Sequence, residues 1–173
     1  MKIGIYYAST SGNTEEVTYQ IGDFIGRDIV EINDIAEVGF RGINSYDLLM
    51  FGIPTWDYGH LQTDWEEHWQ DLDEIDFSDA VVALYGLGDQ YGYSDWYLDS
   101  MGILYNKLKE KGARIIGTWP NEGYTYDNSK ALTENRKHFV GLALDEDSQS
   151  MLTEERIRQW SCNVLEEYAE LLA

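Results

Sequence analysis

The sequence has a single cysteine and little positive charge. Of its 173 residues, 12 are Lys or Arg and 32 are Asp or Glu, so the formal net charge is −20. Contacts to nucleic-acid phosphates and to anionic membranes require clustered basic side chains, and this balance therefore argues against both partners. The lone Cys162 excludes an internal disulfide and a four-cysteine iron–sulfur cluster, and it fits a reducing cytoplasm.

Long apolar runs, linkers and repeats are also absent. Uncharged stretches such as residues 48–56 are far shorter than the ~20 residues that cross a bilayer. The apolar N-terminal stretch ends at the polar segment 9–14, which does not fit a signal peptide. No Pro/Gly/Ser-rich linker or internal repeat divides the chain. We therefore expect one cytoplasmic, monomeric domain over residues 1–173.

What the sequence does contain is an alternation of short apolar runs and longer segments with helical periodicity. Strands are predicted at 2–7, 29–32, 48–53, 80–85 and 114–117, and the last strand resumes at 138–144. Helices are predicted over 13–25, 63–71, 95–111 and 153–172, with Asn13 as the N-cap of the first and Cys162 as a packing residue of the last. The pattern predicts an α/β open sheet of five parallel strands with helices on both faces. An insertion of about twenty residues splits strand five.

The loop after the first strand contains only small polar residues. Its residues are Ser9, Thr10, Ser11, Gly12, Asn13 and Thr14. Hydroxyl groups beside a helix N-terminus, with its free N–H groups and positive dipole end, make an anion site. Because the loop lacks Lys and Arg, it is not a nucleoside-triphosphate loop, and a monophosphate fits it better. The alternative is a Ser/Thr-rich turn that only caps the helix.

The loops after the third and fourth strands carry glycines and exposed aromatic residues. The first contains Pro54, Thr55, Trp56, Asp57, Tyr58 and Gly59, and the second contains Leu87, Gly88, Asp89, Tyr91 and Tyr93. If the strand order is 2-1-3-4-5, both loops lie beside the hydroxyl-rich loop at the carboxyl edge of the sheet, where such folds bind ligands. Together the three loops indicate a slot for a flat ring system with a phosphate tail.

At this point the sequence resembles a known family, the long-chain flavodoxins. The resemblance covers essentially the whole chain, and within the family the second type of flavodoxin found in enteric bacteria is most similar. It is carried by the segments 9–14 (STSGNT), 52–56 (GIPTW), 87–90 (LGDQ) and 139–143 (FVGLA). It implies the 2-1-3-4-5 strand order known for flavodoxins, with FMN bound non-covalently. It also implies a low-potential one-electron carrier that uses the semiquinone/hydroquinone couple and is not an enzyme.

The resemblance also implies a role for each loop. Residues 9–14 would bind the FMN phosphate, Trp56 and Tyr93 would cover the two faces of the isoalloxazine, and Tyr91 is less suited to stacking. The remaining loop positions would line the ring and the ribityl chain. They are Pro54, Thr55, Asp57, Tyr58, Gly59, Leu87, Gly88 and Asp89. Many flavodoxins carry Gly or Asn at the turn where this chain has Asp57, so we expect a less stabilised semiquinone here.

The acidic surface would dock basic redox proteins in transient, salt-sensitive encounters. The resemblance names a flavodoxin/ferredoxin-NADP reductase as the donor and redox enzymes as acceptors. Candidate contacts are Asp57, Asp64, Glu66, Glu67, Asp89 and Asp95. The alternative function is an FMN-dependent quinone or NAD(P)H oxidoreductase on the same fold, which needs one open flavin face. No metal site is expected, because the acidic run 145–147 lacks the spacing of a calcium loop.

Overall fold

The computed structural model describes the whole chain, Met1–Ala173. The strands are β1 (Ile3–Tyr7), β2 (Val30–Asp34), β3 (Leu48–Trp56), β4 (His60–Leu61), β5 (Val81–Leu87), β6 (Arg114–Ile116), β7 (Trp119–Pro120), β8 (His138–Phe139) and β9 (Leu142–Leu144). The α-helices are α1 (Asn13–Ile25), α2 (Ile35–Val38), α3 (Thr63–Glu67), α4 (Asp99–Glu110) and α5 (Thr153–Leu172). Short 3₁₀ turns follow α3 and precede α4 and α5.

The central sheet has the order β2-β1-β3-β5-β6, in which all neighbours are parallel. Strand β9 also pairs in parallel with β5, beyond β6, so the two halves of the predicted fifth strand lie along one partner. The expected count of five strands is wrong in detail: the sheet has seven, including the short antiparallel β4, which pairs with the end of β3. The predicted order 2-1-3-4-5 holds for the parallel strands when β4 is left out and β6 and β9 are counted together as the fifth.

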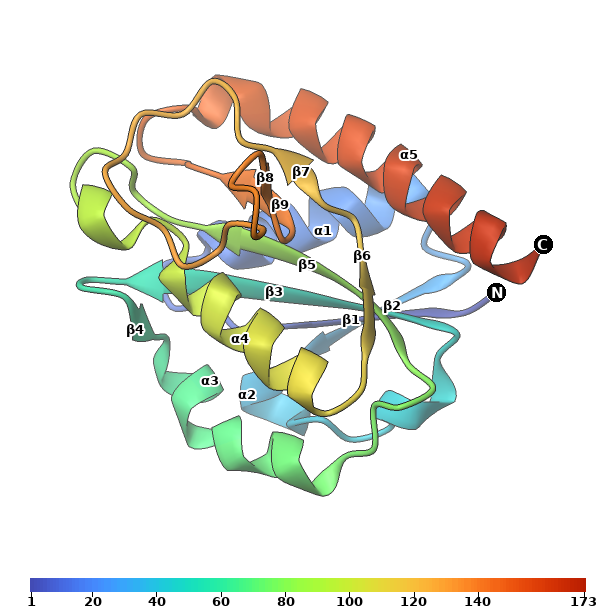
Figure 1. The fold of residues 1–173 in the computed structure, drawn as a ribbon. Coiled ribbons are helices and arrows are strands. Elements are labelled where there is room, and N and C mark those ends of the chain that lie inside the picture. The colour runs from blue at the N-terminus through green and yellow to red at the C-terminus, as the bar shows by residue number, and fades with distance from the viewer.

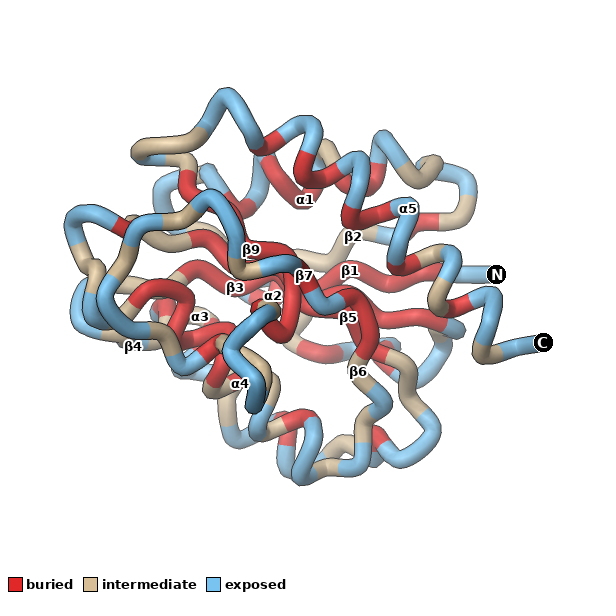
Figure 2. Tube along the Cα trace, turned by 45° about the horizontal axis from the view of Figure 1, so that its top comes forward, coloured by how far each residue is buried: buried red, intermediate tan, exposed pale blue.

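The helices cover both faces of the sheet. Helices α1 and α5 pack together on one face, and α2, α3 and α4 lie on the other (Figure 1). The sheet between them is buried along most of its length (Figure 2). Strands β1, β3 and β5 read as nearly continuous apolar runs because both of their faces are covered. The core therefore fixes the strand ends from which the functional loops emerge.

Helix α5 shows how the periodicity sets burial. Ile157, Trp160, Val164 and Tyr168 recur every three or four residues and are buried against the sheet. Cys162 was predicted as a packing residue, but its side chain is exposed. It lies two residues after Trp160, about half a turn around the helix, and so faces away from the core.

Two helix starts differ from the prediction. The N-cap of α1 is Gly12 rather than Asn13, and no side chain caps the helix. Gly12 has φ 96°, a left-handed conformation that glycine adopts without the Cβ clash of other residues. The predicted helix at 95–111 begins at Asp99, because Leu98 has φ 58° and separates α4 from a 3₁₀ turn at Ser94–Trp96.

The insertion, residues 118–137, leaves the sheet after β6 and returns before β9. Strands β7 and β8 pair with each other in antiparallel fashion at its two ends. Between them the chain packs against the segment that follows β5, with Tyr124 and Tyr126 close to Tyr97 and Phe139. None of the helices has both the length and the apolar character needed to cross a bilayer.

Candidate functional site

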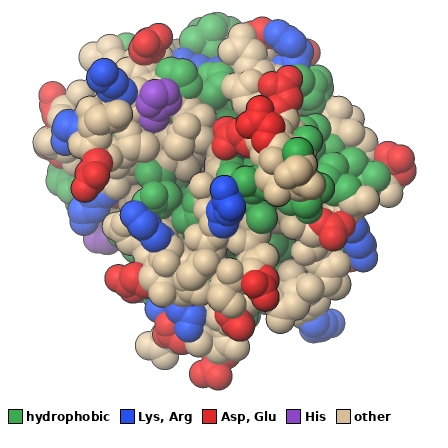
Figure 3. Space-filling model, turned by 45° about the vertical axis from the view of Figure 1, so that its right-hand side comes forward, with side chains coloured by type: hydrophobic (Ala, Val, Ile, Leu, Met, Phe, Trp, Pro, Cys, Tyr) green, Lys and Arg blue, Asp and Glu red, His purple; other side chains and the backbone are tan.

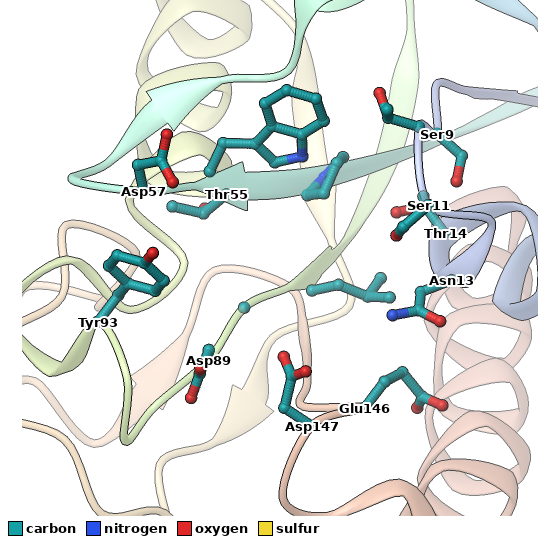
Figure 4. A pocket seen from close by; sticks show the side chains of 15 residues that line it. Ser9, Ser11, Asn13, Thr14, Thr55, Asp57, Asp89, Tyr93, Glu146 and Asp147 are labelled. Carbon is teal, nitrogen blue, oxygen red and sulfur yellow. The ribbon is translucent and has the colours of Figure 1, made fainter.

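A cavity of about 420 Å³ opens at the carboxyl ends of β1, β3 and β5. Its lining comes from the three predicted loops and from the segment after β9. The lining residues are Ser9, Thr10, Ser11, Asn13, Thr14, Pro54, Thr55, Trp56, Asp57, Leu87, Gly88, Asp89, Tyr93, Glu146 and Asp147. Figure 4 shows Ser9, Ser11, Asn13 and Thr14 at one end of the cavity and Asp57 and Tyr93 at the other. The fold thus brings the three predicted loops to one place.

The hydroxyl-rich end is held in shape by its own hydrogen bonds. The Gly12 N–H donates to the Ser9 hydroxyl oxygen at 3.0 Å. Gln62, which is fully buried at the N-cap of α3, donates through Nε2 to the Thr10 hydroxyl oxygen at 3.1 Å. In both cases the hydroxyl oxygen accepts, so its own proton remains available to a ligand. Sequence reasoning missed Gln62 because it lies 52 residues away from Thr10 along the chain.

Helix α1 points its N-terminus at the same end of the cavity. Its first backbone hydrogen bond runs from the Glu16 N–H to the Gly12 carbonyl at 3.0 Å. The amide groups of Asn13, Thr14 and Glu15 precede it and have no helical partner, as at any helix N-terminus. A Cβ added at Gly12 would meet nothing within 4 Å, so the backbone here borders open space. These amides and hydroxyls form an anion site without a basic side chain.

The β3–β4 hairpin forms one wall of the other end. Thr55 pairs with Leu61 and Trp56 with His60, which leaves residues 57–59 as a tight turn. Asp57 has φ 44° and Gly59 has φ 85°. Left-handed backbone costs roughly 1–2 kcal/mol for most residues, and Asp is among the few that enter it locally. The turn is anchored to α4, where the Ser100 N–H donates to the Thr55 Oγ1 at 3.0 Å.

The loop after β5 forms the opposite wall. The Asp89 Oδ1 accepts hydrogen bonds from the Tyr91 N–H at 3.1 Å and the Gly92 N–H at 2.8 Å, which closes a turn. This turn places Tyr93 in the cavity lining, whereas Tyr91 is 61% exposed and lies outside it. Tyr93 therefore borders the cavity and Tyr91 does not, while the stacking of Tyr93 on a flavin stays a prediction.

Exposed aromatic side chains surround this end of the cavity. Tyr58 is 62% exposed and does not line the cavity, although its ring lies edge-on to Trp96 at 4.9 Å and to Tyr93 at 6.0 Å between centroids. The Asp57 carboxylate raises the pKa of the Tyr93 hydroxyl, and partial burial adds to the shift. Tyr58, Gly59 and Gly12 are the predicted site residues that do not line the cavity.

Two lining residues, Glu146 and Asp147, were not predicted. They follow β9, and Figure 4 shows them along the side of the cavity that Asp89 also borders. Burial raises the pKa of Asp147, and the nearby Asp89 and Asp145 carboxylates raise it further. The sequence shows only an acidic run at 145–147, and its place beside the cavity depends on β9 pairing with the end of β5. All four charged residues of the lining are therefore acidic.

Comparison with known proteins assigns the chain to a family. The Flavodoxin family profile matches residues 5–160. The chain belongs to the flavodoxin family. It is 43% identical to Flavodoxin 2 of Escherichia coli K12 over 170 residues, which cover 98% of each sequence. It is 42% identical to a flavodoxin of a Nostoc strain over 167 residues, 96% of this chain and 97% of the relative.

A solved flavodoxin structure superimposes closely on this chain. The crystal structure of Fusobacterium nucleatum flavodoxin bound to flavin mononucleotide matches with a TM-score of 0.90 and 30% sequence identity. The match covers 96% of this chain and 98% of the other. The expected likeness to long-chain flavodoxins is confirmed, including the similarity to the second flavodoxin of an enteric bacterium.

Proposed function

We propose that this flavodoxin binds FMN non-covalently in the carboxyl-edge cavity and carries single electrons at low potential. The observation that carries the proposal is the composition of the cavity. One end offers hydroxyl and backbone N–H donors without a cation, and the other offers Trp56 and Tyr93. A phosphate monoester suits the first end, and a planar ring suits the second. The FMN-bound relative from Fusobacterium nucleatum supports this assignment.

The donors at the hydroxyl end would hold the FMN phosphate. The Ser9, Thr10, Ser11 and Thr14 hydroxyls, the Asn13 amide and the first N–H groups of α1 supply hydrogen bonds, and the dipole of α1 favours the negative charge. Gly12 allows the backbone to approach closely. Glu146 and Asp147 offer carboxylate oxygens beside this end, which suit ribityl hydroxyls as acceptors.

The residues at the aromatic end would bind the ring and set its potential. Trp56 and Tyr93 exclude water, while Thr55, Leu87, Gly88 and Asp89 border the ring edge. Bound FMN supplies the electron chemistry, and the protein supplies position and electric field. With four carboxylates and no Lys, Arg or His in the lining, the field opposes any added negative charge.

The partners proposed are basic redox proteins, a reductase of the flavodoxin/ferredoxin-NADP type as donor and redox enzymes as acceptors. Acidic and basic side chains are interspersed on the face seen in Figure 3, whereas the cavity lining carries only acidic charge. A basic partner would therefore be steered toward the cavity edge. We further propose that the protein acts as a monomer in the cytoplasm, in keeping with its lone cysteine.

The partner proposal predicts a strong salt dependence. The association rate with a basic reductase should fall at least about tenfold between about 20 mM and 200 mM ionic strength, because the Debye length contracts below the range of the acidic field. Stopped-flow measurement of reductase oxidation checks this. Equal rates at both ionic strengths would contradict the steering role.

An electron carrier needs no open flavin face for hydride transfer, whereas the alternative oxidoreductase does. We propose that this protein is a carrier and not an enzyme. An anaerobic dithionite titration of the protein loaded with FMN tests the proposal. A carrier should pass through a one-electron-reduced state with its own visible spectrum and consume no NADPH without a reductase.

The same titration measures how strongly the one-electron-reduced state is favoured. We expect it to be less favoured than in flavodoxins with Gly at the position of Asp57. Direct two-electron reduction, or NADPH oxidation by the protein alone, would contradict the carrier function.

A further inference from the structure

Gln90 is a fully buried polar residue that follows directly after the cavity residue Asp89. Its backbone N–H and its Nε2 both donate to the Asp145 Oδ2, at 3.1 Å and 2.8 Å. Its Oε1 accepts a hydrogen bond from the Thr125 N–H at 2.6 Å. Gln90 thus connects the loop after β5, the segment after β9 and the insertion. Two of these three segments line the cavity.

The Asp145 side chain makes this connection rigid. Its Oδ1 accepts hydrogen bonds from the Asp147 and Ser148 N–H groups, both at 3.0 Å, and its Oδ2 also accepts from the Ser148 hydroxyl at 2.6 Å. The carboxylate is fully buried, and Gln90 supplies two of its five hydrogen bonds, one from its backbone and one from its side chain. A side chain at position 90 must therefore donate toward Asp145 and accept from Thr125. Glutamine can do both, whereas leucine can do neither and ionised glutamate can only accept.

The insertion also forms hydrogen bonds with the loop after β5 at a second point. The Asp127 and Asn128 N–H groups donate to the Ser94 carbonyl at 2.9 Å and 3.0 Å. The Ser94 hydroxyl donates to the Asp127 Oδ2 at 2.7 Å, and the Asn128 Nδ2 donates to the Asp95 Oδ1 at 3.0 Å. Tyr93, which lines the cavity, lies between this anchor and Gln90. The insertion therefore holds the Tyr93 loop from both sides.

We propose that Gln90 is a positioning residue through which the insertion fixes the Asp89–Tyr93 wall of the FMN cavity. This inference rests on the proposed function, since FMN is the ligand whose binding it concerns. Because Gln90 is buried behind the wall, its effect on FMN is transmitted through Asp89, Tyr93 and the Glu146–Asp147 segment. Losing it should therefore alter both the affinity for FMN and the environment of the bound ring.

The test compares Gln90→Leu with Gln149→Leu in the full chain. Gln149 also links the insertion to a neighbouring segment, because its Nε2 donates to the Gly123 carbonyl and its Oε1 accepts from Arg156, both at 2.8 Å. It does not line the cavity, so it controls for loosening of the insertion alone. FMN affinity is measured by fluorescence titration, the ring environment by the visible spectrum of the bound flavin, and stability by thermal unfolding without FMN.

Both variants should lower the unfolding midpoint, but only Gln90→Leu should weaken FMN binding, by about tenfold, and shift the visible spectrum. Gln149→Leu should stay within about twofold of the unsubstituted protein. Equal dissociation constants and equal spectra for the two variants would overturn the inference. If the unsubstituted protein takes up no FMN, the proposed function itself fails, which is a distinct result.

A second variant, Gln90→Glu, keeps the inference testable if Gln90→Leu does not fold. The glutamate still accepts from Thr125, but its carboxylate faces Asp145, with Asp89 and Asp147 oxygens within 4.8 Å of the Asp145 oxygen. Protonation restores a donor, so its FMN affinity relative to the unsubstituted protein should recover from about pH 8 to about pH 5. A ratio of affinities that does not change with pH would overturn the inference.

Discussion

The substitution Ser11→Asp should weaken FMN binding about 150-fold and leave riboflavin binding unchanged. Ser11 is exposed at the hydroxyl end of the cavity, so a carboxylate there faces the phosphate without disturbing the core. At ~5 Å in an effective dielectric of ~40, each unit of phosphate charge costs about 1.7 kcal/mol. A phosphate carries nearly two charges at neutral pH, which gives about 3 kcal/mol in total. Fluorescence titrations with both flavins measure the two affinities.

Riboflavin and a neutral variant separate charge from shape in this experiment. Riboflavin lacks the phosphate, so it reports on the ring end of the cavity alone. Ser11→Asn has nearly the size of the aspartate variant and should retain most of the FMN affinity. The Asp substitution also lies just before the N-terminus of α1, where a negative charge stabilises a helix, so the protein without flavin should remain folded. An equal loss for FMN and riboflavin would show that the phosphate binds elsewhere.

Neutralising three of the four carboxylates of the cavity lining should raise the potential for the second electron by about 100 mV. The triple variant Asp89→Asn, Glu146→Gln and Asp147→Asn keeps the shape of each side chain and removes three negative charges. One carboxylate at ~10 Å in an effective dielectric of ~40 opposes an added electron by about 0.8 kcal/mol. Because ~1.4 kcal/mol corresponds to ~59 mV for one electron, each residue contributes about 35 mV. Equilibration with reference dyes under nitrogen measures the shift.

A matched variant removes the same charge from the far end of the molecule. Glu74, Glu110 and Glu170 are exposed, and they lie outside the cavity. The helices that carry Glu110 and Glu170 end at the side of the sheet opposite the functional loops (Figure 1). Screening over more than a Debye length should limit the shift from their Gln variants to about 10 mV. Similar shifts in the two triple variants would show that net charge, and not the cavity lining, sets the potential.

The local pattern of apolar and polar residues predicted most of the strands and helices. Strands β1, β3 and β5 are nearly all apolar because both of their faces are buried. The pattern failed where the backbone leaves ordinary conformations. Leu98 has an apolar side chain typical of a helix interior, yet its φ of 58° separates a 3₁₀ turn from α4. Strand β4 consists of His60 and Leu61 only, and nothing in so short a segment marks a strand. These features are set by tertiary contacts such as the Ser100–Thr55 hydrogen bond.

The site was predictable where each loop carries its own chemistry and unpredictable where contacts span the chain. The hydroxyl-rich composition of the segment 9–14 predicts an anion site, and Trp56 and Tyr93 are recognisable as aromatic residues on glycine-containing loops. Gln62, Gln90, Glu146 and Asp147 carry no such local sign. Glu146 and Asp147 line the cavity, and Gln62 and Gln90 lie behind its walls, only because α3 packs beside the first loop and β9 lies alongside the end of β5.

The divided last strand also leaves one edge of the sheet poorly suited to pairing with another chain. An unpaired edge invites another chain to add a strand, and long flat edges are the most exposed to this. Here the edge beside β5 is made of two three-residue strands, β6 and β9, and the insertion separates them along the chain. No partner strand can run straight along such an interrupted edge. The insertion that contacts the loop after β5 is thus also the segment that interrupts this edge of the sheet.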